Sequence, residues 1–243
     1  MNMRQVELER EDIRPEAQMP LWKRALDVTL ILALAPGLLL IGALVAILVK
    51  VGSRGPVFFR QHRVGFKGRE FVCFKFRTMR VDAETESHQR HTQQLIRSQV
   101  PMVKLDARRD PRLIPLGSIL RVSGLDELPQ LFNVLRGDMS LVGPRPCIPY
   151  ECEAYESWHW RRFDAVPGLT GLWQVSGKNR TTFDQMVRLD IEYSQRMNLW
   201  LDLSILFRTI PALWGQYCDQ RAVRSQTPLR QPSHSPKSVG SYT

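Results

Sequence analysis

The longest apolar segment of the chain runs from Val28 to Val49 without a charged residue. As a straight helix it would be roughly 33 Å long, about the thickness of the hydrocarbon core of a bilayer. It is apolar on all sides, whereas a surface helix of a soluble domain keeps a polar face. We therefore predict a membrane segment. The alternatives are a buried core helix and a cleaved signal peptide, and the latter fits poorly because a long polar stretch precedes the run.

Two features decide how this segment would sit in a bilayer. The Ala35-Pro36 step lies near its middle, and proline removes a backbone donor and clashes with the preceding turn, so we expect the helix to break there. Positive charge flanks both ends, at Lys23 and Lys50, and such charge usually marks the cytoplasmic side. The pattern favours a re-entrant hairpin of two short helices over residues 21–50, with a straight spanning helix as the alternative.

Beyond residue 50 the pattern changes to short elements of mixed polarity. Apolar and polar residues alternate in Glu70–Arg77, and a second extended segment, Pro56–Phe59, lies on the other side of a glycine-rich turn, which predicts a β-hairpin. Helices are expected over Asp126–Leu135 and Trp200–Tyr217. The last one is rich in apolar residues and would either lie in the membrane interface or close a soluble core.

The chain therefore divides into four segments. Residues 1–20 and 218–243 are polar and are expected to be poorly ordered tails. Residues 21–50 form the membrane hairpin, and residues 51–217 form a small globular domain in which the polar stretch 82–112 is a surface insertion. The predicted fold class is α/β, a small domain attached to a re-entrant helix-break-helix hairpin, with interfacial amphipathic helices.

Charge and cysteine content narrow the partners and the compartment. The chain carries 34 Lys and Arg residues against 24 Asp and Glu residues, a formal net charge of +10. This charge favours polyanions: nucleic acid, an anionic membrane surface or phosphorylated substrates. The four cysteines, Cys73, Cys147, Cys152 and Cys218, lack a paired metal-binding spacing, so we expect reduced thiols.

Two adjacent carboxylates, Asp126 and Glu127, are candidate chemical groups. Ser123 precedes Asp126 by the spacing of a helix N-cap and its N3 partner, so both acids are expected in a first helical turn. The helix dipole there favours ionised carboxylates, and an ionised aspartate can act as a nucleophile. Acidic residues at such positions are also common as simple capping residues, so the pair by itself fits either role.

A set of cations could face phosphate groups. Arg145 lies between Pro144 and Pro146, whose fixed φ angles stiffen the backbone, so its guanidinium would be a pre-organised phosphate clamp. A rigid turn with a solvated arginine is the alternative. The other candidates for phosphate binding are Lys75, Arg77 and Arg121.

A further segment, Pro167–Arg180, combines glycines, an aromatic residue and several hydrogen-bond donors. It would be a loop that contacts a nucleotide or a sugar, or simply a strand and a turn. Gln174 and Asn179 are its candidate contact residues.

The ordered motifs resemble the bacterial sugar transferase family, the monotopic polyprenyl-phosphate phosphoglycosyl transferases. The resemblance covers roughly residues 22–215 and rests on Lys23-Arg24 with Asp27, the interrupted apolar run, Lys75–Met79, Leu125–Leu131, Gly137–Ser140, Gly143–Pro146 and Pro167–Gly171. Two positions depart from the family's pattern. Ala35 stands where a serine usually precedes the proline, and Gly124 stands where a serine is frequent before Leu-Asp-Glu.

The resemblance implies a reaction and roles for the candidate residues. Asp126 would attack the β-phosphate of a UDP-sugar, release UMP and carry the phosphosugar, which polyprenyl (undecaprenyl) phosphate would then take up. Glu127 would assist, as a metal ligand or by managing the acceptor's proton. The candidate cations would stabilise phosphoryl charge, and Asp138 would orient a cation or support the metal. Such a reaction initiates exopolysaccharide, capsule or glycoconjugate assembly.

The resemblance also implies a cofactor, partners and a location. Mg²⁺ would be held by Asp126 and Glu127, since Mg²⁺ prefers oxygen ligands and neutralises a diphosphate. The expected partners are a UDP-sugar donor, a polyprenyl phosphate acceptor and membrane lipids, with no nucleic acid and with homo-oligomer formation left open. The catalytic domain, residues 51–217, is expected on the cytoplasmic face of the bacterial inner membrane. The rival hypothesis, a membrane-tethered binding protein, accounts for charge and anchor but not for the paired acids.

Overall fold

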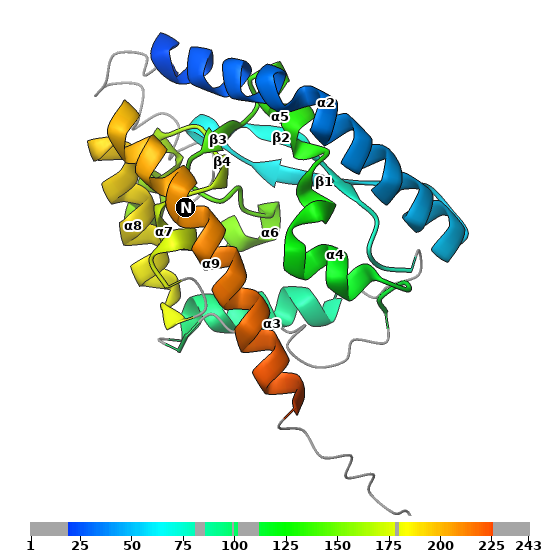
Figure 1. The fold of residues 1–243 in the computed structure, drawn as a ribbon. Helices are drawn as coiled ribbons and strands as arrows, with labels where there is room; N and C mark the ends of the chain where they lie inside the picture. Colours follow the sequence, from blue (N-terminus) through cyan, green and yellow to red (C-terminus); the bar gives the residue numbers. More distant parts are fainter. Residues whose placement is uncertain (1–18, 81–85, 99, 102–111, 178–179, 226–243) are drawn as a thin grey trace, which may run out of the picture.

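The computed structural model describes residues 19–80, 86–98, 100–101, 112–177 and 180–225. The elements in chain order are α2 (Leu21–Gly52), β1 (Phe58–Val64), η1 (Phe66–Gly68), β2 (Glu70–Phe76), α3 (Glu86–Arg97), α4 (Gly117–Ser123), η3 (Leu125–Glu127), α5 (Gln130–Arg136), β3 (Ser140–Val142), α6 (Pro149–Cys152), η4 (Ser157–Asp164), β4 (Gly168–Thr170), α7 (Leu172–Val175), α8 (Phe183–Arg196) and α9 (Leu199–Ser225), where η marks a 3₁₀ helix. This mixture of helices and short strands, with one long apolar helix across it, agrees with the coarse α/β expectation (Figure 1).

Strands β1 and β2 form an antiparallel hairpin. Phe58 lies opposite Phe76 and Val64 lies opposite Glu70. The predicted hairpin is confirmed, and its first strand continues past the predicted end at Phe59. Burial along β2 does not alternate, because Cys73 and Phe76, which point to opposite faces of the strand, are both buried and belong to different core clusters.

Strands β3 and β4 form a second, parallel pair with Ser140 opposite Gly168. The strand alternative for the segment that begins at residue 167 is therefore confirmed for its first residues. Just after β3, the backbone at Gly143 comes very close to the backbone at Val166. A Cβ atom on Gly143 would lie 2.2 Å from the carbonyl oxygen of Val166. Only glycine fits at such a distance, so this residue sets the path of the chain that leaves β3.

Helix α2 is continuous through Ala35 and Pro36. The expected break into two short helices is not observed. Proline removes one ladder hydrogen bond and crowds the preceding turn, but a helix can pass through it with a bend. Figure 1 shows α2 bending over the domain without folding back on itself. Among the described residues, α2 is the one helix long and apolar enough to cross a membrane.

The N-terminal part of α2 is fixed to the domain by buried polar groups. Lys23 Nζ lies 2.5 Å from Oδ2 of Asp202 in α9 and 2.8 Å from the Tyr193 hydroxyl in α8. One turn later, Asp27 accepts the backbone N–H of Leu141 in β3 at 3.0 Å. A buried ion pair of this kind fixes geometry more than it adds stability, so these contacts set the direction in which α2 starts.

The C-terminal part of α2 packs on the same domain through apolar side chains. Val45 and Val49 are buried in a cluster with Phe76, Ile114 and Leu120. Between these two contact regions most side chains of α2 are exposed. The large exposed side chains there are Leu32, Leu34, Leu39, Leu40, Ile41 and Leu44.

Helices α8 and α9 close the other side of the domain. A capping box begins α8, in which Thr182 and Gln185 exchange side-chain and backbone hydrogen bonds at 3.3 and 3.0 Å. In α9, Ile205 is fully buried with Val142 and Tyr193, so the core alternative holds for one side of this helix. Its other side is exposed, and the helix continues to residue 225, past the predicted boundary at 217.

Candidate active site

Asp126 and Glu127 lie in the 3₁₀ turn η3 and not in the first turn of a longer helix. Ser123 is the last residue of α4, and its hydroxyl lies 2.9 Å from the carbonyl oxygen of Ile119 in the same helix. Gly124 follows with φ +73°, a left-handed conformation that ends α4. The expected Ser123 N-cap is therefore wrong, because glycine ends one helix at the point where a capping serine would begin another.

The turn is held from two sides. Leu125 and Leu128, which flank the two acids, pack against the cluster that contains Val45 and Val49 of α2. Strand β2 also contacts η3. Helix α2 and the hairpin thus position the acids together, so the apolar helix is part of the site's framework.

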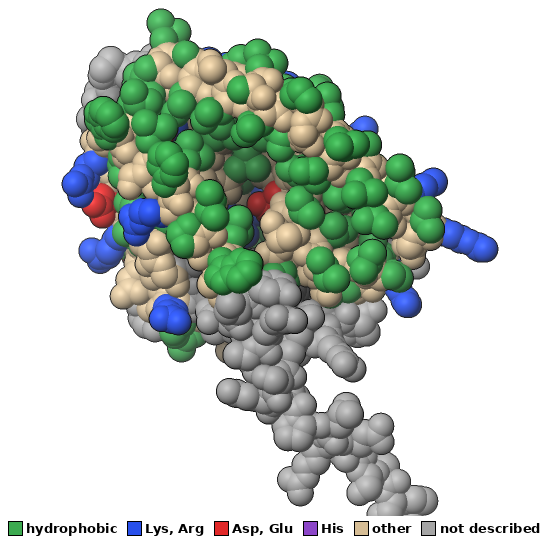
Figure 2. Space-filling model, viewed as in Figure 1, with side chains coloured by type: hydrophobic (Ala, Val, Ile, Leu, Met, Phe, Trp, Pro, Cys, Tyr) green, Lys and Arg blue, Asp and Glu red, His purple; other side chains and the backbone are tan. Residues whose placement is uncertain are grey.

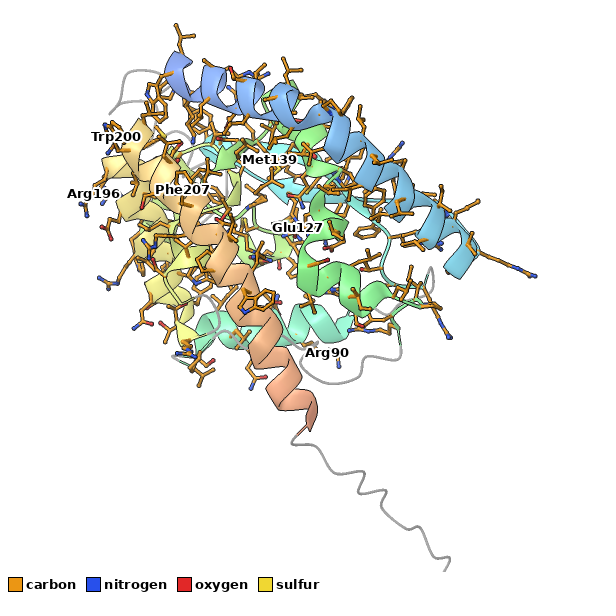
Figure 3. The ribbon with its side chains drawn as sticks, viewed as in Figure 1. Arg90, Glu127, Met139, Arg196, Trp200 and Phe207 are labelled. Carbon is orange, nitrogen blue, oxygen red and sulfur yellow. The ribbon has the colours of Figure 1, made fainter. Side chains whose placement is uncertain are left out.

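Glu127 pairs with a lysine from the hairpin. Lys75 Nζ lies 2.7 Å from Glu127 Oε1, and the two side chains are 21% and 38% exposed. Asp126 is only 8% exposed. Figure 3 shows Glu127 near the middle of the face that carries α9, and Figure 2 shows acidic atoms in a hollow at the centre of this face. The site therefore contains a buried carboxylate, that of Asp126, beside a partly exposed ion pair between Glu127 and Lys75.

The segment that carries Arg145 is held rigidly. Four consecutive carbonyl oxygens, those of residues 144–147, accept hydrogen bonds in order from Gly168 N (2.9 Å), Arg162 Nη2 (3.1 Å), Arg63 Nη1 (2.9 Å) and Val64 N (2.9 Å). The Arg145 side chain remains 30% exposed. A stiff main chain with an accessible guanidinium suits recognition of a phosphate group.

The buried thiol of Cys73 lies within electrostatic reach of these groups. Burial raises the pKa of Cys73, the charges of Lys75, Arg63 and Arg145 oppose this rise, and Glu127 adds to it. Four charged groups, which come from β1, β2, η3 and the segment after β3, therefore surround this thiol at electrostatic range. Three of them are cations, so this neighbourhood favours an anionic ligand.

Two other candidate cations differ in their surroundings. Arg77 is 5% exposed, and its guanidinium donates to the carbonyl oxygens of Ser53 (2.9 Å) and Arg54 (2.6 Å) just after α2. It therefore holds the segment that follows α2, and its burial leaves little of the guanidinium accessible to a substrate. Arg121 is half-buried in the last turn of α4, next to η3.

The supporting candidates Asp138 and Gln174 lie in other elements of the domain. Asp138 Oδ2 lies 3.3 Å from Asn133 Nδ2 and 3.4 Å from Arg136 Nε, so it ties the turn after α5. Gln174 lies in α7, and its buried Oε1 has no hydrogen-bond partner among the described residues. Asn179 lies outside the described residues.

Sequence reasoning missed several buried polar residues around the site. They are Arg63, Asn133, Glu151, Arg162 and Asp190. Their partners fall outside the helical i,i+3 and i,i+4 spacings that mark pairs in a sequence. In the linear chain they are therefore indistinguishable from ordinary surface charges and amides.

The face around the hollow is mainly apolar. Figure 2 shows apolar side chains over α2, α4 and α9, with basic side chains at the margin. The large exposed apolar residues of these helices include Leu39, Leu40, Ile119, Phe207, Ile210 and Trp214. A contiguous apolar surface of this kind indicates contact with a membrane or another apolar partner.

Fold and site together define a class: a small mixed domain with a long apolar helix, whose paired acids and cations are equipped to act on phosphate groups. The family profile described as bacterial sugar transferase matches residues 18–216, and the chain belongs to this family of transferase enzymes.

Relatives within the family extend over most of this chain. It is 43% identical over 191 residues to galactosyl transferase CpsE of Streptococcus agalactiae, a match of 77% of this chain and 41% of CpsE. It is 41% identical over 216 residues to the exopolysaccharide production protein ExoY of Rhizobium meliloti, 83% of this chain and 88% of ExoY. It is 41% identical over 210 residues to the UDP-glucose:undecaprenyl-phosphate glucose-1-phosphate transferase of Caulobacter vibrioides, 82% of this chain and 72% of that protein. The chain thus spans less than half of CpsE but most of ExoY.

Proposed function

We propose that this protein transfers a sugar-1-phosphate from a UDP-sugar to a polyprenyl phosphate at a membrane surface, the first step in assembling an exopolysaccharide or a related glycan. The observation that carries the proposal is the turn at Asp126 and Glu127, paired with Lys75 and close to Arg145, beneath an apolar face. The names of the Caulobacter and Rhizobium relatives support the acceptor and the pathway.

In the first half-reaction a carboxylate oxygen of Asp126 attacks the β-phosphorus of the UDP-sugar. A bond forms between that oxygen and phosphorus, the bond from phosphorus to the bridging oxygen breaks, and UMP leaves with the bridging oxygen. Lys75 and Arg145 stabilise the negative charge on the phosphoryl oxygens. Because Asp126 is largely buried, water has little access to the resulting aspartyl phosphosugar.

In the second half-reaction an oxygen of the polyprenyl phosphate attacks the same phosphorus. The bond between phosphorus and Asp126 breaks, which gives a polyprenyl diphosphate sugar and restores the carboxylate. Glu127, which Lys75 holds at 2.7 Å, is placed to accept the proton of a monoprotonated acceptor or to share in holding a metal ion.

The residues present fit Mg²⁺ held jointly with substrate. No group of three or more His, Cys, Asp or Glu side chains that could hold a metal occurs among the described residues. Mg²⁺ in phosphoryl-transfer sites is usually held by one or two carboxylates plus the substrate phosphates, and Asp126 and Glu127 supply that number. When bound, Mg²⁺ would neutralise part of the diphosphate charge.

The packing of α2 supports a re-entrant membrane segment. Its early part is tied to Asp202 through Lys23, and its late part is packed on Phe76 through Val49. A straight spanning helix would place its ends on opposite sides of the bilayer, whereas both parts of α2 contact one domain. The positive charge at both ends supports a location of the domain on the cytoplasmic face of the bacterial inner membrane.

The reaction is tested by UMP release. Protein held in nanodiscs is supplied with Mg²⁺, polyprenyl phosphate and either UDP-glucose or UDP-galactose, the sugars suggested by the relatives' names. We expect release by the wild type and a loss of at least about a thousandfold in Asp126→Asn, since removal of a nucleophile removes the pathway. Glu192→Gln, on the outer surface of α8, is the matched control and is expected to retain full activity.

The covalent intermediate has a separate test. Without acceptor, a donor labelled in the β-phosphate should leave label on the wild type, and hydroxylamine should release it, as expected of an acyl phosphate. Label retained by Asp126→Asn would move the nucleophile elsewhere. No UMP release by the wild type with any UDP-sugar would contradict the proposed function and favour a membrane-tethered binding protein.

A further inference from the structure

Glu151, in α6, is a buried carboxylate beside the candidate site, and its pairing is incomplete. It is 2% exposed. Oε2 lies 3.4 Å from Nη1 of Arg145, while Oε1 is buried and has no hydrogen-bond partner among the described residues. Leaving a buried acceptor unpaired is unfavourable for folding, so the placement of this carboxylate suggests a role beyond stability.

Glu151 acts on the charge of Arg145. Burial opposes the charged form of this guanidinium, Glu151 favours it, and the pKa of Arg145 is raised above its ordinary value. The carboxylate therefore offsets the cost of keeping a partly buried cation charged before an anionic ligand arrives.

The main chain of Arg145 is fixed independently by a second buried network. Arg162 Nη2 donates to the Arg145 carbonyl oxygen at 3.1 Å and to Asp190 Oδ2 at 2.7 Å. Nη1 of Arg162 donates to the Tyr155 hydroxyl at 2.7 Å. With the backbone set in this way, the remaining freedom of Arg145 lies in its side-chain torsions, and these are the degrees of freedom that Glu151 restrains.

We propose that Glu151 is a positioning residue, which orients the Arg145 guanidinium toward the donor's diphosphate without touching the substrate. This inference rests on the proposed function. A carboxylate at one edge of a guanidinium leaves its other N–H groups available for phosphate oxygens. The 3.4 Å contact is long for an ion pair, and such contacts commonly tighten only in the substrate complex.

The test is a double-mutant cycle on kcat/KM for the UDP-sugar, measured by UMP release from the full chain in nanodiscs. The four proteins are the wild type, Glu151→Gln, Arg145→Met and the double variant. We expect Glu151→Gln to lower kcat/KM about tenfold in the wild type but less than about twofold in the Arg145→Met background, because the two residues act as one unit. Glu153→Gln, exposed just after α6, is the matched control and is expected to leave kcat/KM unchanged.

Thermal unfolding of all four proteins separates positioning from a structural role. If Glu151 had only a structural role, Glu151→Gln would lower the unfolding temperature, and it would lower kcat/KM by the same factor in the wild type and in Arg145→Met. That result overturns the inference. Should Glu151→Gln fail to fold, Glu151→Asp keeps the charge and withdraws it by one methylene. The loss of kcat/KM caused by Glu151→Asp must likewise disappear in the Arg145→Met background.

The outcomes also distinguish this inference from the proposed function. If the wild type releases UMP but the losses of kcat/KM in Glu151→Gln and Arg145→Met are additive in the double variant, only the role of Glu151 is overturned. If the wild type releases no UMP with any UDP-sugar, the proposed function and this inference are overturned together.

Discussion

At the residue scale, His159 in η4 shows how burial sets the charge of a side chain in this domain. Its imidazole is 3% exposed, and Nδ1 accepts the backbone N–H of Glu156 at 2.9 Å. Nε2 lies 3.4 Å from Asp184 Oδ1. Burial lowers the pKa of His159 and Asp184 opposes this only in part, so the neutral imidazole with its proton on Nε2 is the form that the fold accommodates.

This burial predicts a pH dependence of stability. Because the pKa of His159 is lower in the folded state, the unfolded chain binds more protons below its ordinary pKa of about 6.5. The free energy of unfolding should therefore fall as pH drops from about 7.5 to 5.5, by at most about 1.4 kcal/mol per pH unit from this group. Thermal unfolding of the wild type and of His159→Gln over this range measures the effect. Equal slopes for the two proteins would exclude His159 as the cause.

The candidate site could be predicted in part from single residues. Local patterns and motifs indicate Asp126, Glu127, Lys75 and Arg145, and the structure places these residues in one neighbourhood. Glu151 could not be named, because its significance depends on a contact made in three dimensions. Sequence reasoning identifies groups that carry chemistry better than groups that hold them in place.

At the element scale, the close approach of the chain just after β3 to the chain just before β4 depends on a missing side chain. A Cβ atom on Gly143 would lie 2.2 Å from Val166 O and 2.9 Å from Gly168 N. Neither backbone atom can move without disturbing the strand pair. Gly143→Ala should therefore destabilise the protein by about 3 kcal/mol or more, and weaken activity through the Arg145 segment that follows.

Gly42→Ala is the matched control, because its Cβ atom meets nothing within 4 Å and it lies inside α2. Alanine in an open helical position should be neutral or stabilising by about 0.5–1 kcal/mol. Thermal unfolding in detergent compares the two variants. A Gly143→Ala protein as stable as Gly42→Ala would show that the backbone can give way at this close approach.

The elements that sequence reasoning predicted are those with local signals. The β1–β2 hairpin has alternation and a glycine-rich turn, and it was confirmed. The β3–β4 pair joins segments that lie far apart in the chain, so no local pattern indicates it. The break expected at Pro36 was not observed, because the cost of one proline in a helix can be offset by packing at both ends.

At the scale of the whole molecule, the apolar face predicts which aromatic residues meet lipid. Trp200 in α9 is 79% exposed, and Figure 3 shows it at the edge of this face. Trp173 is 5% exposed inside the domain. In vesicles that contain brominated lipid, Trp200→Phe should reduce quenching of the protein's fluorescence, whereas Trp173→Phe should not. Equal quenching in Trp200→Phe and the wild type would place α9 away from the bilayer.

The attachment of α2 at both ends has a consequence for how the protein matures. A chain shortened by residues 1–52 would leave Asp202 buried without its cation and would open the cluster around Phe76, against which Leu125 and Leu128 of the Asp126 turn pack. Such a chain should not yield a water-soluble enzyme. Docking of α2 and completion of the domain's packing are then a single event, so the domain reaches its final packing only in a chain that carries this helix.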